Sequence, residues 1–223
     1  MHESVIIVAG GSGSRMKQIL PKQFMEILGK PIVVHTIEAF LAYNPSIQLI
    51  LVLPEMHMPT WRTIQNDFLS EVDIITAAGG KSRFQSVKSG LSHVSGNLVA
   101  IHDAVRPIIS TSVIAASFGQ AKATGSGIAM VPLKDSIRER VGEQTQARDR
   151  SLYMAVQTPQ TFQTDLIRKA FEQQESSLFT DDASVLEAYG LPIEVVTGDY
   201  SNIKITTPED LVLAEALLRM QGK

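Results

Sequence analysis

The stretch VIIVAGGSGSRM, residues 5–16, decides the fold of this chain. Its first five residues are apolar and mostly β-branched, which is typical of a central parallel strand buried on both faces. Three glycines follow, Gly10, Gly11 and Gly13. Because glycine lacks a Cβ, the backbone N–H groups of such a loop approach an anion closely. A strand that leads into this loop therefore predicts a phosphate site at its carboxyl end.

Two common phosphate loops and a plain turn are the alternatives for this stretch. A dinucleotide-binding fold needs a third glycine and an acidic residue about 20 positions further on. Met16 occupies the third-glycine position, and the only acidic residue near that distance, Glu38, lies in a helical pattern. This argues against a nicotinamide-dependent oxidoreductase. A P-loop also fails, because no Gly-Lys-Ser/Thr sequence occurs near the loop. A purely structural glycine turn stays open at this point.

Strand-like runs alternate with helical segments along most of the chain. Runs typical of buried strands recur at 49–54, 72–78, 98–103, 127–133 and 192–198. Helical spacing occurs at 33–43, 82–94 and 112–125, and TPED at 207–210 caps a last helix. This alternation predicts an α/β protein, a Rossmann-like three-layer sandwich with a mostly parallel sheet. No repeat or low-complexity linker interrupts residues 1–223, so we expect a single domain.

One segment, at about 134–160, breaks this rhythm. It holds two strand-like pieces around a polar middle that contains Gly142. A polar hairpin of about 20 residues that cannot bury both faces projects from a domain, and such arms often pair with a partner subunit. A loose surface loop is the alternative, but the apolar character of RSLYMAVQTPQ, residues 150–160, argues against it. We therefore expect a projecting β-arm that mediates dimerisation.

Composition narrows the classes of function. The 223 residues carry a formal net charge of −3 and include no cysteine. The acidic balance gives no reason to expect a nucleic-acid partner, and without cysteine there are no disulfides, thiolate nucleophiles or cysteine-ligated metals. No cationic leader precedes the first strand, and no apolar run approaches the ~18 residues that span a bilayer. We expect a cytoplasmic protein with no membrane partner.

Cationic side chains gather at the glycine-rich segments and at the ends of predicted strands. They are Arg15, Lys22, Arg83, Arg106 and Lys204. In open α/β sheets the ligand lies at the carboxyl ends of the strands, so these cations predict a small polyanion, such as a triphosphate. Each cation alone is also compatible with an ordinary surface position, as for Lys204 on a solvent-facing edge strand.

The strand at 98–103 ends in two further polar residues, His102 and Asp103. Asp103 at this edge is suited to orient Mg²⁺ or a substrate hydroxyl, although a strand-terminating aspartate in a turn is the plainer interpretation. His102 is interpreted as structural, because no second histidine stands at metal-ligand spacing.

Six motifs in order carry a family resemblance. AGGSGSRM followed by PKQF resembles the signature of the sugar-phosphate nucleotidyltransferases. GGKSRFQSVKSGL, HDAVRP, QTPQTF, TDDASVLEAYG and NIKITTPEDL narrow the match to the 2-C-methyl-D-erythritol 4-phosphate cytidylyltransferases of the non-mevalonate isoprenoid pathway. The resemblance runs from about Val5 to Leu218. It implies a single nucleotidyltransferase domain that transfers a cytidylyl group from CTP to a polyol phosphate and releases pyrophosphate, without a covalent enzyme intermediate.

The resemblance also implies roles for individual residues. The catalytic set it implies is Arg15, Lys22, Arg150 and Lys204. Around the nucleotide it places Ala9, Gly10, Gly11, Gly13, Gly80, Arg83, Ser86, Asp103 and Ala104. Around the methylerythritol phosphate it places Asp103, Arg106, Ser136, Arg150, Thr158 and Lys204. Mg²⁺ is the implied cofactor, held mainly by the CTP phosphates. Family members are homodimers whose arm reaches the partner's site, so Arg150 is implied to act in trans.

Two departures from the family pattern bear on the acceptor. Ser136 stands where threonine is frequent, and the hydroxyl is retained. Val105 stands where alanine is common, and valine there is familiar from ribitol-5-phosphate cytidylyltransferases, which share PKQ, QTPQ and NIKITTP. Ribitol 5-phosphate is therefore the alternative acceptor. A catalytically inactive nucleotide-binding regulator is the alternative of another class, and the presence of Arg15, Lys22 and Lys204 argues against it.

Overall fold

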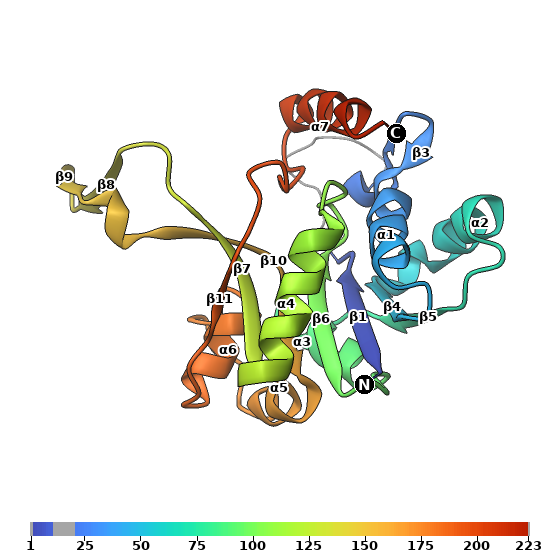
Figure 1. The fold of residues 1–223 in the computed structure, drawn as a ribbon, viewed down its shortest axis with the longest axis horizontal. Coiled ribbons are helices and arrows are strands. Elements are labelled where there is room, and N and C mark those ends of the chain that lie inside the picture. Colours follow the sequence, from blue (N-terminus) through green and yellow to red (C-terminus); the bar gives the residue numbers. More distant parts are fainter. Residues whose placement is uncertain (1, 11–20, 223) are drawn as a thin grey trace.

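The computed structural model describes residues 2–10 and 21–222 (Figure 1). Its centre is a seven-stranded sheet with the order β11-β7-β10-β6-β1-β4-β5. All neighbouring strands pair in parallel except β10, which runs antiparallel to β6 and β7. The strands are β1 (Glu3–Val8), β4 (Gln48–Leu53), β5 (Ile74–Ala78), β6 (Leu98–Asp103), β7 (Ser126–Pro132), β10 (Met154–Gln163) and β11 (Val195–Thr197). The predicted mostly parallel sheet is confirmed, and the strand at 192–198 is shorter than expected.

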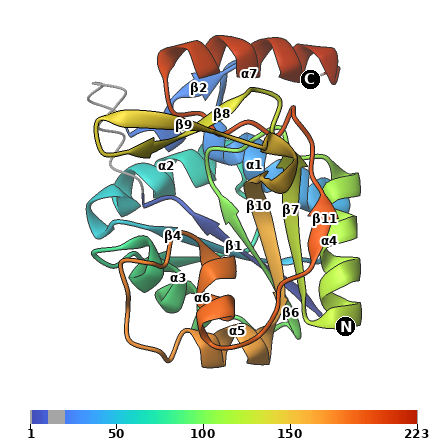
Figure 2. The same ribbon diagram turned by 90° about the vertical axis from the view of Figure 1, so that its left-hand side faces the viewer.

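Helices cover both faces of the sheet, as Figure 2 shows. One face carries α1 (Ile32–Tyr43), α2 (Met58–Phe68) and α4 (Thr111–Thr124); the other carries α3 (Arg83–Leu91), α5 (Thr164–Ala170) and α6 (Asp182–Ala188). Successive side chains of a strand point to opposite faces. Accordingly Val5 and Ile7 pack in the first core cluster and Ile6 in the second. This is the predicted three-layer sandwich.

Local sequence explains where several of these helices begin and end. Ser82 accepts a hydrogen bond from the Gln85 N–H at the start of α3, and Asp181 accepts one from the Ser184 N–H at the start of α6. Gly125 ends α4 with a φ of 107°, a left-handed conformation that favours glycine. A Cβ on Gly90 of α3 would lie 2.8 Å from Cγ2 of Ile6, so this glycine allows α3 to pack closely on β1.

A third apolar cluster lies above the carboxyl ends of the strands. Here α7 (Pro208–Met220) packs on the short hairpin of β2 (Glu26–Ile27) and β3 (Lys30–Pro31). The segment that leads into α7 passes the end of β6, where the Ile205 N–H donates to the Val105 carbonyl at 2.9 Å. This segment forms no strand, so the expected strand-like position of Lys204 is wrong. Within the described part of the chain, no helix is long and apolar enough to cross a membrane.

A two-stranded arm projects from the sheet (Figure 1). It spans residues 133–153, between β7 and β10, and its strands are β8 (Ile137–Val141) and β9 (Gln144–Arg148), which pair antiparallel around Gly142, a turn residue with a φ of 60°. The predicted arm is present, but its expected boundary at 160 is too late. Residues from Met154 onward belong to β10, because they pair with β7 and β6 in the central sheet.

Candidate active site

The order of the strands creates a crevice between β1 and β6. The chain adds β4 and β5 on one side of β1 and then crosses to place β6 on the other side. At such a switch point the connections leave in opposite directions, so the carboxyl edge stays open for a ligand. Val8 and Asp103 end the two strands side by side, and the Ala104 N–H donates to the Val8 carbonyl at 3.1 Å. The glycine loop of the opening stretch begins here.

A pocket of about 320 Å³ occupies this crevice; we call it the glycine compartment. It brings together segments near residues 10, 22, 80, 103 and 204. The predicted nucleotide-binding residues in its lining are Ala9, Gly10, Gly80, Arg83, Ser86, Asp103 and Ala104. Two predicted catalytic lysines, Lys22 and Lys204, line it as well.

A second pocket, of about 300 Å³, adjoins the first; we call it the threonine compartment after Thr158 and Thr180. It lies between β10, the start of α6 and the end of β6. Arg106 and Thr158, both predicted to bind the acceptor, line it. Three residues line both compartments: Arg83, Asp103 and Lys204. The two pockets are therefore halves of one site that share a wall.

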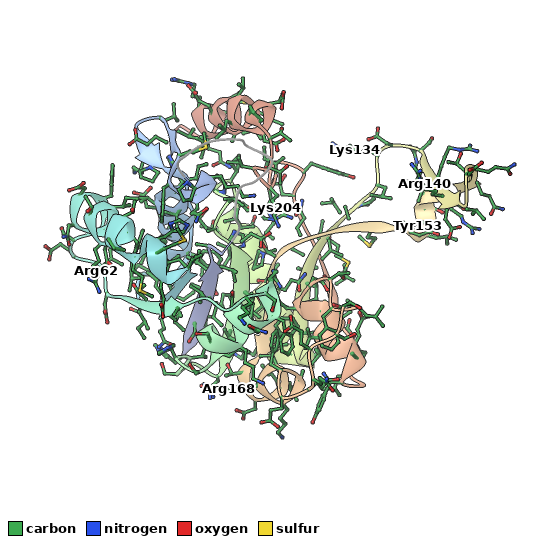
Figure 3. The ribbon with its side chains drawn as sticks, turned by 180° about the vertical axis from the view of Figure 1, so that it is seen from behind. Arg62, Lys134, Arg140, Tyr153, Arg168 and Lys204 are labelled. Atoms are coloured by element: carbon green, nitrogen blue, oxygen red, sulfur yellow. The ribbon has the colours of Figure 1, made fainter. Side chains whose placement is uncertain are left out.

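That shared wall is a cluster of charges around the buried carboxylate of Asp103. Its Oδ2 lies 2.9 Å from Nζ of Lys204 and 3.4 Å from Nε of Arg106, and its Oδ1 lies 4.0 Å from Nε of Arg83. Burial alone would raise the pKa of Asp103, but the three cations outweigh burial and hold that pKa well below its usual range. Asp103 is thus a permanent anion that orients cations. Figure 3 shows Lys204 above the sheet, at the level where the strands end.

Arg83 is fixed from its other side by α6. Its Nη1 and Nη2 donate to the two carboxylate oxygens of Asp182 at 2.7 and 2.6 Å. Asp182 is buried, with 1% of its side chain exposed, and lies 99 positions further along the chain. A bidentate pair of this kind sets both the position and the plane of a guanidinium. Arg83 therefore stands as a rigid divider between the two compartments.

Thr158 and His102 form a buried hydrogen-bond chain beneath Asp103. Nε2 of His102 faces the Arg106 carbonyl at 3.2 Å, which accepts only, so this nitrogen carries the proton. Nδ1 therefore accepts from the Thr158 hydroxyl at 3.1 Å, and Oγ1 of Thr158 accepts from the Asp103 N–H at 3.1 Å. Burial lowers the pKa of His102 to about 4, so the ring is neutral near pH 7. The expected structural role of His102 agrees with these contacts.

The buried hydrogen bonds of His102 make the stability of the fold sensitive to mild acid. Because the pKa of His102 falls from 6.5 to about 4 on folding, only the unfolded state binds a proton between these values. We expect the free energy of unfolding to drop by roughly 3 kcal/mol between pH 6.5 and pH 4. Urea unfolding at several pH values measures it. His102→Asn keeps an acceptor for Thr158 without titrating, and an equal loss in that variant would contradict the assignment.

The loop around Gly80 is shaped by Ser86. The Ser86 hydroxyl accepts from the Gly80 N–H at 3.1 Å and donates to the Ser82 carbonyl at 2.8 Å. A Cβ on Gly80 would lie 2.3 Å from Cβ of Gln85, so only glycine fits.

The segment that carries Lys22 forms another wall of the glycine compartment. Nζ of Lys22 donates to the Ile205 carbonyl at 3.3 Å, and the buried Gln23 side chain donates to the Ala9 carbonyl at 2.9 Å. Gln23 thus ties the segment that carries Lys22 to the end of β1.

Some predicted residues lie elsewhere. Gly11, Gly13 and Arg15 fall outside the described residues. Ser136 and Arg150 are exposed on the arm and line neither compartment, and Arg150 donates to the Lys134 carbonyl there. Figure 3 shows that Arg140 and Tyr153 of the arm stand far out from Lys204. Within one subunit the structure therefore does not bring the arm residues to the site.

Several residues of the site went unpredicted. Their side chains line the compartments or hold residues that do, and they include Gln23, Gln157, Thr180, Asp181 and Asp182. All fall within the motifs PKQF, QTPQTF or TDDASVLEAYG or directly next to them. The motifs were the available signal, but pairing Asp182 with Arg83 requires the tertiary fold.

Comparison with known proteins decides the family. The family model of IspD, 2-C-methyl-D-erythritol 4-phosphate cytidylyltransferase, matches residues 4–220. The chain belongs to the IspD family. The IspD protein of Bacteroides fragilis is 44% identical over 219 residues, which cover 98% of this chain and 100% of that protein. The chain is thus a member of a family of enzymes.

Solved structures agree with the IspD assignment. The 2-C-methyl-D-erythritol 4-phosphate cytidylyltransferase of Thermus thermophilus has a TM-score of 0.79 at 31% identity, with 98% of this chain and 100% of that chain covered. The 4-diphosphocytidyl-2C-methyl-D-erythritol synthase of Anaerococcus prevotii has a TM-score of 0.82 at 28% identity, with 98% of this chain and 96% of that chain covered. The resemblance inferred from the six motifs is confirmed at the level of the family.

Proposed function

We propose that this protein transfers the cytidylyl group of CTP to 2-C-methyl-D-erythritol 4-phosphate, giving 4-diphosphocytidyl-2-C-methyl-D-erythritol and pyrophosphate in isoprenoid precursor synthesis. The observation that carries the proposal is the pair of compartments that share Arg83, Asp103 and Lys204. A transfer between two substrates needs two binding places that meet where the bond forms. The family of the chain supplies the identity of the two substrates.

The geometry supports a direct displacement. With CTP in the glycine compartment and the acceptor in the threonine compartment, the α-phosphorus and the acceptor phosphate meet beside the shared wall. A phosphate oxygen of the acceptor attacks the α-phosphorus, and the bond to the departing pyrophosphate breaks. Such a transfer depends mainly on positioning and on neutralising negative charge. No nucleophilic side chain is required.

Different cations neutralise the negative charge of the two substrates. Lys204 and Arg106, both held by Asp103, face the compartment assigned to the acceptor phosphate. Lys22 faces the compartment assigned to CTP, where charge builds up on the departing pyrophosphate. Fixed donors aimed at developing charge act without reorganisation, which is why they accelerate a reaction. Arg15 is proposed to act with Lys22.

The donor set fits Mg²⁺ that is bound mainly by phosphates. Asp103, a carboxylate in the lining of both compartments, already faces Lys204, Arg106 and Arg83. We therefore propose that the magnesium ion reaches the site with CTP, where it offsets phosphate charge, and that Lys22 and the glycine loop hold the nucleotide.

We also propose a homodimer formed through the arm. Leu152, Tyr153 and Met154 are exposed where the arm joins β10, which leaves apolar surface for a partner. Arg150 of this arm lines neither compartment of its own subunit. In the dimer, Arg150 and Ser136 would complete the acceptor site of the partner. A cytoplasmic location also stays a prediction.

Pyrophosphate release tests the proposed activity. The purified protein is supplied with CTP and Mg²⁺ and, in parallel, with 2-C-methyl-D-erythritol 4-phosphate, ribitol 5-phosphate or no acceptor. We expect the methylerythritol phosphate to give the highest kcat/KM. Faster turnover of ribitol 5-phosphate would establish the alternative acceptor. Binding of CTP, seen as a raised melting temperature, without pyrophosphate release from either acceptor would instead favour the nucleotide-binding regulator.

A further inference from the structure

The lining of the threonine compartment has an unusual composition. Of its ten described residues, nine carry charged or polar side chains. The tenth is Val156, the only aliphatic side chain among them. A wall of cations, carboxylates, amides and hydroxyls suits the phosphate and hydroxyl groups of a polyol phosphate. Val156 offers none of these hydrogen bonds, so it requires a separate explanation.

Val156 is held in place by the sheet. It lies on β10 opposite Met130 of β7, directly before the point where the pairing register shifts between Val156 and Gln160. The adjacent Gln157 is anchored on both sides of its amide: it donates to the Asp199 carbonyl at 2.7 Å and accepts from the Asp199 N–H at 3.2 Å. Thr158 belongs to the buried chain under Asp103. Val156 is nevertheless 41% exposed, so its side chain is fixed in direction and open to a ligand.

The acceptor of the proposed reaction matches this arrangement. Methylerythritol phosphate carries hydroxyl groups, one phosphate and a single methyl branch, whereas erythritol and ribitol phosphates carry no branch. We propose that Val156 receives the methyl branch of the acceptor and selects it over unbranched polyol phosphates. The proposal rests on the proposed function and adds a residue that determines acceptor specificity. Apolar contact rewards the branched acceptor only, since an unbranched one leaves the valine surface in water.

Thr180 is the competing candidate, because its side chain also ends in a methyl group and lines the same compartment. The Thr158 methyl is less suited to the role, since this residue is 5% exposed. Thr180→Ser removes one methyl from the compartment and keeps the hydroxyl, so it is a matched control. Val156→Thr replaces one methyl by a hydroxyl in a β-branched side chain of the same shape, which suits the strand.

The test compares two acceptors that differ only in the branch. Pyrophosphate release is measured with CTP and either 2-C-methyl-D-erythritol 4-phosphate or D-erythritol 4-phosphate, and the ratio of the two kcat/KM values is the readout. We expect Val156→Thr and Val156→Ala to lower this ratio roughly three- to tenfold, the effect of about one methyl contact at a half-open site. Thr180→Ser should change kcat/KM for both acceptors by a similar factor and leave their ratio within about twofold of the wild type.

The outcomes separate the two proposals. An unchanged ratio in both Val156 variants, with the wild type active on the branched acceptor, would overturn the role of Val156 and leave the proposed function intact. A ratio that falls in Thr180→Ser but not in the Val156 variants would also overturn it, in favour of Thr180. If the wild type releases pyrophosphate with neither acceptor, both proposals fail together. Melting temperatures of the variants show that each is folded.

Discussion

Alanine in place of Lys22 is expected to lower kcat by about 10²- to 10³-fold, the usual effect of removing one donor that stabilises developing charge. Lys22 lines the glycine compartment, and its ammonium donates to the Ile205 carbonyl. Asp103 pairs with Arg83, Arg106 and Lys204, so the loss of Lys22 removes none of these three contacts. Turnover of saturating CTP and methylerythritol phosphate, followed by pyrophosphate release, measures the effect.

Two controls separate catalysis from folding in this experiment. The melting temperature of Lys22→Ala should stay close to that of the wild type. Lys30→Ala removes a nearby lysine that pairs with Glu38 at 2.6 Å and lines neither compartment, so kcat should remain within about twofold, as is usual for surface substitutions. Near-normal turnover in Lys22→Ala would contradict the catalytic role assigned to this residue.

Mixing two inactive subunits is expected to restore activity if the arm works in trans. Lys22→Ala and Arg150→Ala homodimers should each be nearly inactive. In a mixed dimer, one site combines an intact Lys22 with the intact Arg150 of the partner, and the other site lacks both. Differently tagged subunits, purified as mixed dimers, should therefore show about half of the wild-type activity, as expected of a twofold assembly with shared sites.

The structure also supplies the matched control for this complementation. Lys204 and Lys22 line the same compartment of one chain, so both act on the same site. Mixed dimers of Lys22→Ala and Lys204→Ala have one defect in each site and should stay inactive. Restored activity in this control, or none in the Lys22→Ala and Arg150→Ala pair, would show that the arm does not lend Arg150 to its partner.

Local sequence patterns predict the sheet better than they predict the site. The segments that form β1, β4 and β6 are continuous apolar runs, and such runs predict strands that are buried on both faces. Gly125 signalled the end of α4 for an equally local reason, its left-handed φ. The helix α2 went unpredicted, since only Trp61 of its residues is fully buried and its apolar spacing is sparse.

The site depends on contacts that no spacing reveals. Arg83 was predicted from a motif, but the carboxylate that fixes it, Asp182, lies 99 positions away. Lys204 was expected on a strand, yet it reaches Asp103 from an irregular segment that a backbone hydrogen bond from Ile205 ties to Val105. Thr158 was expected to touch the acceptor, and the structure adds that its hydroxyl is already shared between His102 and Asp103. Motifs located these residues, whereas their partners came from topology.

The bond between Arg83 and Asp182 has a consequence for synthesis of the protein. A ribosome releases the strands β1, β4, β5 and β6 long before it reaches α6 and the segment that bears Lys204. Until then Arg83 lacks its bidentate partner, and Arg106 lacks the Asn202 carbonyl to which its Nη1 donates at 2.7 Å. A nascent or truncated chain thus carries Asp103 with Arg83 and Arg106, but it lacks Lys204 and the two partners that fix these arginines. The site that begins at the first strand is therefore completed only when Asp182, Asn202 and Lys204 have been synthesised.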